Sequence, residues 1–195
     1  MLNMTVSLNE IYDLMDKAIV YLSQNTWLDK WKIQKGIFYY LWLYSVQKGV
    51  KFNDIAKKIE IHPDRQGPFS LSIQGEVDSL VRDGFLDVIN PEQKTMTVKS
   101  SKKGLSEFIG EITEEEEEYL QSIRYLVENL ESDEVIFFIY YNPYIPDDIK
   151  EYFISKSEIK ESLRRNKTKY IERLLSLKII DNVTAKKIDN MVNRS

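Results

Sequence analysis

One stretch, from Asp29 to Val50, constrains the fold more than any other part of the chain. It reads DKWKIQKGIFYYLWLYSVQKGV, and its apolar and aromatic residues fall on nearly every face of a helix. A helix that is hydrophobic on all sides is buried on all sides. Its roughly 17 residues, which begin with lysines, are too few and too polar at one end to span a bilayer. Gly49 is placed to end the helix as a C′ glycine. The stretch therefore predicts the central helix of a soluble core.

The composition excludes several classes of protein. The 195 residues include no cysteine, which rules out disulfides, thiolate zinc sites and a thiol nucleophile. The first residues lack a charged segment followed by an apolar run, so no signal peptide is expected. No apolar stretch reaches the roughly 18 residues that suggest a membrane span. We therefore expect a cytoplasmic protein that makes no contact with a membrane.

Charge is distributed unevenly along the chain. The net charge of −4 disfavours a nucleic-acid binder. The segment from Lys150 to Arg194 nevertheless holds 12 basic and 6 acidic residues, and the remainder is acidic overall. Such asymmetry indicates either a basic contact surface at one end or two oppositely charged regions that attract each other.

Four helices are expected in the first part of the chain. Ser7-x-x-Glu10 is a capping box ahead of a helix over about residues 8–23. The aromatic helix follows it. A short amphipathic segment at Lys51–Ile59 predicts a third helix, and the spacing of apolar residues predicts a fourth over about Ser70–Asp83. Gly84 is placed to end this fourth helix.

A hairpin completes the element order of a winged helix-turn-helix. His62–Gly67 is predicted to be a polar loop. Phe85–Ile89 and Thr95–Val98 are predicted strands on either side of a turn at Asn90–Gln93. We therefore predict a mainly helical α+β fold, with a winged-helix domain over residues 1–112 that carries a two-stranded wing.

Residues 113–195 are predicted to form a helical C-terminal region, joined to the wing by a linker at Lys99–Ile112. Thr113-x-x-Glu116 and Ser155-x-x-Glu158 are capping boxes. The apolar run Val135–Tyr141 is short enough to be a strand or a buried helix, and we favour a short helix. A further set of apolar residues follows at spacings close to the 3.5-residue repeat of paired helices. These residues are Ile159, Leu163, Tyr170 and Leu174. They predict a seam through which two copies of the chain form a homodimer.

The sequence offers little support for catalysis. His62 is the single histidine, and no partners stand at the spacings of a catalytic triad or a histidine-based metal site. No phosphate-binding glycine motif occurs. Acidic residues are plentiful, but they gather in helix starts and solvated faces, so no catalytic carboxylate pair can be picked out. We expect no enzyme activity, no catalytic residue, no metal and no cofactor.

The helix over Ser70–Asp83 is the element with which a winged-helix protein would read a DNA duplex. The residues at or near it that are placed to reach a groove are Arg65, Ser70, Ser72, Gln74 and Arg82. The lysines placed to hold the phosphate backbone from the wing are Lys94, Lys99, Lys102 and Lys103. Asp78, on the same face of the helix, would repel phosphate. The first hypothesis is a dimeric DNA-binding transcriptional regulator.

Gly75 favours a different function. A glycine in the middle of a helix costs about 1 kcal/mol relative to alanine, so it suggests the close approach of a neighbour. Leu71 lies one turn earlier on the same face, and the two together predict a surface for a partner helix. The other interpretation is an exposed glycine with no role. The alternative hypothesis is therefore a protein-binding adaptor or antitoxin-like module that uses the scaffold without DNA.

Short motifs between Lys30 and Lys156 resemble those of a known family. Lys32-Ile33-Gln34-Lys35 is similar to a K-L-Q-K motif, and Gly67-Pro68-Phe69-Ser70 with Gly84-Phe85-Leu86 is similar to Y-G-P-F-S … G-L-I. Tyr140-Tyr141-Asn142-Pro143-Tyr144 is similar to a later Y-x-x-Y-P segment. These motifs belong to the YwgA-like proteins and the related Panacea antitoxin domain (as in SocA). The resemblance implies a mostly helical fold with a wing-like hairpin, a helix at Val135–Tyr141, and a function in binding proteins, such as toxin neutralisation or protease adaptation.

Overall fold

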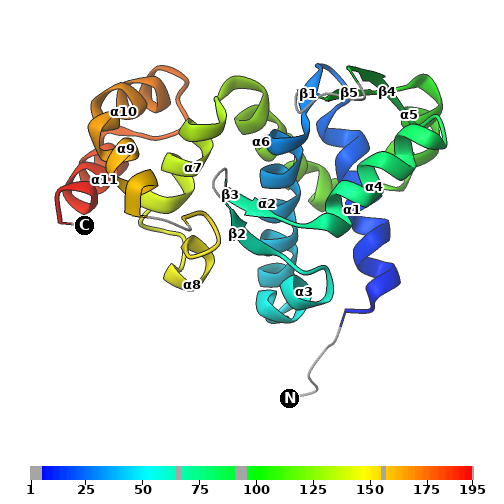
Figure 1. Cartoon of the computed structure of the whole chain (residues 1–195), viewed down its shortest axis with the longest axis horizontal. Coiled ribbons are helices and arrows are strands. Elements are labelled where there is room, and N and C mark those ends of the chain that lie inside the picture. Colours follow the sequence, from blue (N-terminus) through cyan, green and yellow to red (C-terminus); the bar gives the residue numbers. More distant parts are fainter. Residues whose placement is uncertain (1–5, 65–66, 91–95, 155–156, 195) are drawn as a thin grey trace. The chain divides into compact units, whose positions relative to one another are not determined.

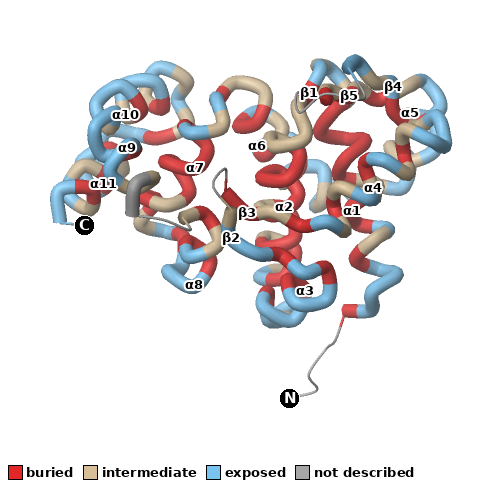
Figure 2. Tube along the Cα trace, viewed as in Figure 1, coloured by how far each residue is buried: buried red, intermediate tan, exposed pale blue. Residues whose placement is uncertain are grey.

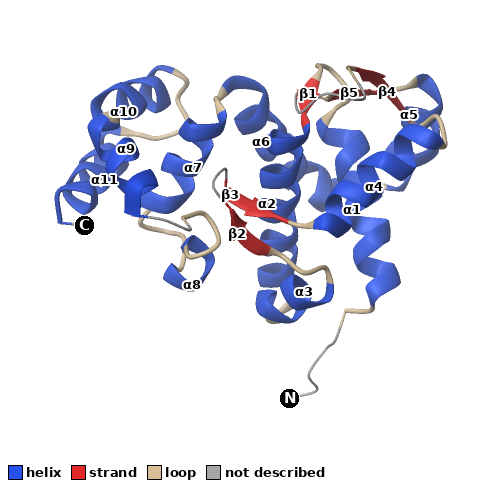
Figure 3. Ribbon diagram, viewed as in Figure 1, coloured by secondary structure: helices blue, strands red, loops and turns tan. Residues whose placement is uncertain are grey.

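The computed structural model describes residues 6–64, 67–90, 96–154 and 157–194. The protein is mainly helical with a small antiparallel sheet, as the sequence predicts (Figures 1 and 3). The chain forms two compact units. The first comprises Met1–His62 and Phe69–Glu128, and the second comprises Pro63–Pro68 and Asn129–Ser195. The boundary drawn from the sequence at residue 112 lies before the last helix of the first unit.

The first unit begins with helices that the sequence anticipates. Its elements are α1 (Leu8–Leu22), β1 (Leu28–Asp29), α2 (Lys30–Lys48), α3 (Phe52–Lys58), α4 (Leu71–Arg82), β4 (Leu86–Ile89), β5 (Thr97–Ser100), α5 (Lys102–Phe108), the 3-10 turn η1 (Ile109–Glu111) and α6 (Glu114–Asn129). A short two-stranded sheet, β2 (His62–Asp64) with β3 (Gly67–Phe69), stands where the sequence predicted a polar loop, so that prediction was wrong.

The aromatic helix α2 is enclosed along most of its length, as predicted (Figure 2). The Asp29 carboxylate caps it by accepting hydrogen bonds from the backbone N–H groups of Trp31 and Lys32, both at 2.9 Å. Gly49 ends it in the left-handed conformation, with φ of +66°. Gly36 lies where α2 meets its neighbours: a Cβ atom there would stand 2.8 Å from Leu22 Cδ1.

The sheet has the strand order β1-β5-β4, and all of its pairs are antiparallel. Val98 of β5 pairs with Leu28 on one side and with Val88 on the other. The two strands predicted from the sequence are therefore confirmed, although β5 begins later than expected. The two-residue strand β1 was not predicted. Because β1 directly precedes α2, the sheet is fixed to the start of the central helix.

The predicted linker at Lys99–Ile112 is mostly helical, so that prediction was wrong. Ser101 Oγ caps α5 by accepting a hydrogen bond from the N–H of Gly104 at 3.1 Å. A Cβ atom at Gly104 would lie 2.3 Å from the carbonyl oxygen of Phe85. The helix therefore needs a glycine at this position to approach the hairpin.

Apart from its residues in β2 and β3, the regular structure described in the second unit is helical. Its helices are α7 (Ser132–Tyr141), α8 (Asp147–Lys150), α9 (Ser157–Arg165), α10 (Lys167–Ser176) and α11 (Asn182–Arg194). The apolar run that ends at Tyr141 is a buried helix, as favoured from the sequence. The predicted capping box that starts at Ser155 lies outside the described residues.

Candidate functional site

Ser70, predicted to contact DNA, is buried and serves as the N-cap of α4. Its Oγ accepts a hydrogen bond from the N–H of Ile73 at 3.3 Å and donates one to the carbonyl oxygen of Ile59 at 2.5 Å. The Gln34 side chain bonds to both backbone groups of Ser70: its amide donates to the Ser70 carbonyl at 2.9 Å and accepts from the Ser70 N–H at 3.1 Å. These contacts fix the start of α4 on α2 and leave Ser70 out of reach of any ligand.

The outward side of α4 is a stripe of exposed residues, which we call the open face. It consists of Leu71, Gly75, Asp78 and Arg82. Leu71 is 66% exposed, and a Cβ atom at Gly75 would have no neighbour within 4 Å. The open face therefore presents a large apolar side chain and a bare stretch of helix backbone to solvent.

Most polar side chains on and beside the open face bond to one another. Gln74 donates a hydrogen bond to Asp78 Oδ1 at 3.0 Å. Arg82 donates one to Ser79 Oγ at 2.9 Å, and its Nε lies 3.8 Å from the Asp83 carboxylate. Ser72 is half-buried. Gln74 and Arg82, two of the predicted base-reading residues, are therefore engaged with neighbours on their own helix.

The electrostatics of α4 are acidic. The helix contains the acidic residues Glu76 and Asp78, and Asp83 follows it directly. Its one basic residue is Arg82. Burial raises the pKa of Asp16, on α1, to about 8, and a hydrogen bond with Glu76 and the negative charges of Glu76, Asp13 and Asp83 add to the increase. Asp16 thus binds a proton more tightly in the folded protein, and the acidic residues of and beside α4 would repel an approaching phosphate.

The described lysines that were predicted to hold a phosphate backbone differ in their surroundings. Lys103 donates a hydrogen bond to the Asp83 carbonyl oxygen at 2.7 Å, and its Nζ lies 4.2 Å from the centre of the Phe85 ring. Lys99, half-buried in β5, pairs with Asp87 of β4 in the sheet register. Lys102 is exposed. Lys94 and Arg65 lie outside the described residues.

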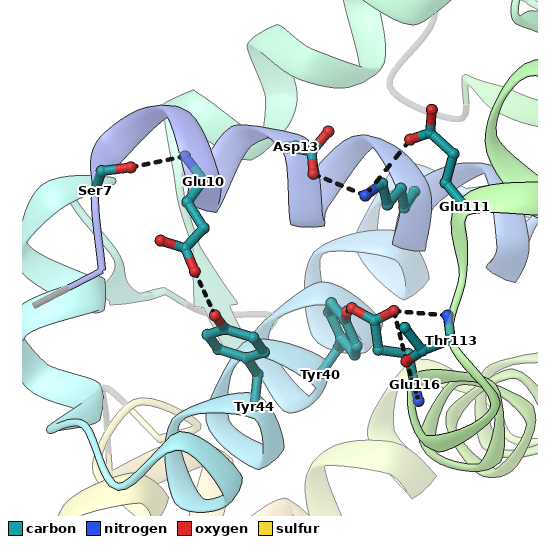
Figure 4. Close-up of polar contacts among 9 residues, drawn as sticks. Ser7, Glu10, Asp13, Tyr40, Tyr44, Glu111, Thr113 and Glu116 are labelled. Atoms are coloured by element: carbon teal, nitrogen blue, oxygen red, sulfur yellow. Dashed lines mark hydrogen bonds and ion pairs between the residues drawn. The ribbon is translucent and has the colours of Figure 1, made fainter. Parts of the chain in front are cut away.

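A second polar cluster joins α1 and α6 to two tyrosines of α2 (Figure 4). Tyr44 donates a hydrogen bond to Glu10 of α1 at 2.6 Å, and Tyr40 donates one to Glu116 of α6 at 3.4 Å. Glu116 also accepts from the N–H and the hydroxyl of Thr113, both at 2.9 Å, so the predicted capping box is confirmed. Burial first, and then the adjacent carboxylates, raise the pKa values of Tyr40 and Tyr44. These phenols therefore stay protonated, and they act as hydrogen-bond donors that tie three helices together.

The residues predicted to pair two chains pack inside the second unit. Leu163, Tyr170 and Leu174 are buried, and Ile159 is half-buried. The ring of Tyr170 lies 5.1 Å from that of Phe137, centre to centre. The heptad-like spacing thus reflects packing within the chain, and these side chains do not form an exposed dimer seam.

The second unit also contains a pocket that the sequence did not indicate. Its volume is about 300 Å³, and Lys150 and Lys160 both line it beside the tyrosine pair at the end of α7. The sequence showed both lysines but gave no sign that they converge, because they belong to different helices. Two larger hollows have volumes of about 780 and 710 Å³. The first is lined by residues of α10 and α11, and the second by residues of and between these helices together with Phe138 of α7, Asn142 and Tyr144.

Neither a metal site nor a membrane-spanning helix is present among the described residues. Across the described ranges, no group of three or more histidine, aspartate or glutamate side chains is placed to bind a metal ion. Within those same ranges, no helix combines the length and the apolar character that crossing a membrane requires. Comparisons of the chain with protein-family models, curated proteins and solved structures gave no match.

Proposed function

We propose that the first unit is a winged-helix scaffold that binds a partner protein through the open face of α4. The scaffold part of the proposal rests on topology. The element order is helix, short strand, helices and then a hairpin, and the short strand β1 pairs with the second hairpin strand β5. In a winged helix-turn-helix, the helix before the wing is the recognition element. Helix α4 occupies that position here.

Gly75 is the observation that carries the proposal. A glycine inside a helix costs about 1 kcal/mol of stability relative to alanine. Glycines at close contacts within a fold offset this cost by letting elements approach, but the space around Gly75 is open. A partner that lies against the helix backbone at Gly75 would use the missing side chain. Leu71, one turn away and 66% exposed, would supply apolar contact beside it.

The chemistry of the open face favours a protein as the binding partner over a DNA duplex. Recognition helices present arginine, lysine, asparagine or glutamine side chains to base edges. Here Ser70 is a buried cap, Gln74 bonds to Asp78, and the open face has Arg82 as its one basic residue, with Asp83 directly after it. The partner that fits best offers an apolar side chain to the surface beside Leu71 and a basic side chain to Asp78. The motif resemblance to proteins that act by binding other proteins points the same way.

A DNA-binding regulator is the second candidate function. Its specific support is the position of α4 before the β4–β5 hairpin, together with the exposed Lys102 just after that hairpin. Such a protein would lose affinity steeply as salt concentration rises, because phosphate contacts release counterions. A protein-binding surface of the kind proposed would depend far less on salt.

Two glycine variants test the proposal against this alternative. Gly75→Leu fills the open face, and Gly110→Leu is its matched control, because Gly110 is also exposed and also has no atom within 4 Å of a Cβ. Affinity capture from native cells, quantified by mass spectrometry, is expected to recover the same specific protein with the wild type and Gly110→Leu but not with Gly75→Leu. Duplex DNA at low salt is expected to show no retention by fluorescence anisotropy. Capture that is unaffected by Gly75→Leu, together with DNA retention that Lys102→Glu abolishes, would overturn the proposal.

A further inference from the structure

The pocket of the second unit brings together two cations and three apolar or aromatic side chains. It is lined by Tyr140, Tyr141, Asp147, Lys150, Glu151, Lys160 and Met191. Lys150 ends α8 and Lys160 lies in α9, so two separate helices each contribute an ammonium group. A volume of about 300 Å³ is at the small end of the range for ligand sites in proteins.

Lys150 is unusually buried for a lysine. Its side chain is 8% exposed, whereas that of Asp147, its ion-pair partner at 3.2 Å, is 94% exposed. Removing an ammonium group from water is costly unless well-ordered partners compensate for the lost hydration. A solvent-exposed carboxylate supplies only weak compensation, and a competing anion can displace it at little cost.

Lys160 completes the positive side of the pocket. Its Nζ lies 5.3 Å from the centre of the Tyr140 ring. A hydrogen bond with Tyr140 is the main cause that raises the pKa of Lys160 above its ordinary value. Lys160 therefore stays charged, and its position is set by an aromatic neighbour rather than by an acidic one.

The remaining walls are suited to an apolar group. The rings of Tyr140 and Tyr141 meet edge to face, with centres 5.0 Å apart and planes at 88°. Met191, from α11, supplies a flexible apolar side chain. Asp147 and Glu151 limit the negative charge that a ligand can carry, because a dianion would be repelled by both carboxylates.

We propose that this pocket binds a small monocarboxylic acid. The carboxylate of the ligand replaces Asp147 as the partner of Lys150 and is shared with Lys160. The apolar body of the ligand lies against Tyr140 and Met191. This site is independent of the open face of α4, because all of its residues belong to the second unit.

Titration of the full chain with phenylacetate tests the site, with inorganic phosphate as the comparison ligand. The ¹³C-methyl resonance of Met191 is the local probe. We expect saturable binding of phenylacetate with a Kd of about 1 mM or tighter, and binding of phosphate at least about tenfold weaker. No saturable shift, or equal affinity for phosphate, would overturn the proposal.

Three variants separate a binding site from a structural ion pair. Lys160→Met is expected to weaken phenylacetate binding at least about tenfold, while Lys169→Met, at an exposed lysine of α10, leaves it unchanged. Asp147→Asn removes the competing carboxylate and is expected to strengthen binding about threefold. A purely structural role for the Lys150–Asp147 pair predicts no gain in affinity from Asp147→Asn. Binding that is unchanged by both Lys160→Met and Asp147→Asn would also contradict the proposal.

Discussion

Helices α2 and α4 belong to the same unit, and each carries a glycine near its middle, but the two glycines have opposite surroundings. A Cβ at Gly36 of α2 would lie 2.8 Å from Leu22 and 3.4 Å from Val127, whereas a Cβ at Gly75 of α4 would meet nothing. The first glycine is explained by the fold, because it lets α1 and α6 approach α2. The second has no such explanation within the first unit. The same residue type therefore marks internal packing in one helix and an external surface in the other.

The polar side chains of the two helices differ in the same way. Gln34 of α2 is buried and bonds to both backbone groups of Ser70. Gln74 of α4, by contrast, bonds to Asp78 on the surface of its own helix. A polar group on α2 thus holds the fold together, whereas one on α4 can exchange its partner for water or for another molecule.

The largest expected effect separates the two glycines directly. Gly36→Leu is expected to lower the free energy of unfolding by about 3 kcal/mol or more, because the side chain overpacks a closed contact. Gly75→Leu is expected to raise it slightly, by up to about 0.8 kcal/mol, because leucine forms helix better than glycine and the side chain enters solvent. Urea unfolding followed by circular dichroism measures both. Equal losses from the two variants would remove the distinction between the helices.

The two glutamines provide the next test. Gln34→Ala is expected to cost about 2 kcal/mol, because it leaves the buried N–H and carbonyl groups of Ser70 without their partner. The matched change Gln74→Ala is expected to cost less than about 0.5 kcal/mol. The same unfolding experiment applies. A small loss from Gln34→Ala would mean that α4 is not fixed to α2 through Ser70.

The contact between α1 and α4 is expected to make stability depend on pH. The folded state raises the pKa of Asp16 from 3.8 to about 8, so it binds the proton more tightly than the unfolded state does. The stabilisation is therefore complete at low pH and is lost as the pH rises through about 4 to about 8. Asp16→Asn is expected to make the free energy of unfolding depend less on pH. The difference between its values at the low and high ends of this pH range should fall by about 1–2 kcal/mol, allowing for solvent screening. Glu76→Gln removes a negative charge that raises this pKa, and it should shift the transition to lower pH. A pH profile that neither variant changes would refute the raised pKa of Asp16.

The smallest effect concerns the backbone of α4. Gly75→Ala is expected to raise the free energy of unfolding by roughly 0.5–1 kcal/mol, because alanine is the better helix former and nothing obstructs its methyl group. Gly36→Ala is expected to lower it, because its methyl group meets Leu22. A stability gain at Gly75 that is accompanied by weaker partner capture would indicate that function, rather than folding, keeps this glycine.

Elements with strong local signals could be predicted from the sequence. Spacing along the chain predicts that α2 is apolar on all sides and ends at a glycine, and the structure agrees. It also predicts the capping box at Thr113 and the outward orientation of Leu71 and Gly75, which the structure shows as well. The short strand β1 could not be predicted in this way. It consists of two residues, and it exists because it pairs with Val98 and Thr97, about seventy residues later.

Other predictions that the structure did not confirm also have specific physical causes. Lys99–Ile112 was predicted to be a linker, although most of it is helical, and a close approach to the Phe85 carbonyl explains why that helix contains Gly104. Ser70 looked like an accessible polar residue, because its burial depends on Gln34, which lies far away in the sequence. A heptad-like spacing predicts that helices pair, but it does not reveal whether the partner helix belongs to the same chain. Leu163, Tyr170 and Leu174 are consequently buried in their own unit. The convergence of Lys150 and Lys160 also arises only from tertiary packing.

Site-specific photo-crosslinking in native cells tests the central claim most directly. A benzophenone amino acid replaces Gly75 in one variant and Gly110 in the control, and adducts are identified by mass spectrometry. The proposed open-face interaction predicts a discrete protein adduct from position 75 and none from position 110. Adducts to DNA from position 75, or the same protein adducts from both positions, would contradict it.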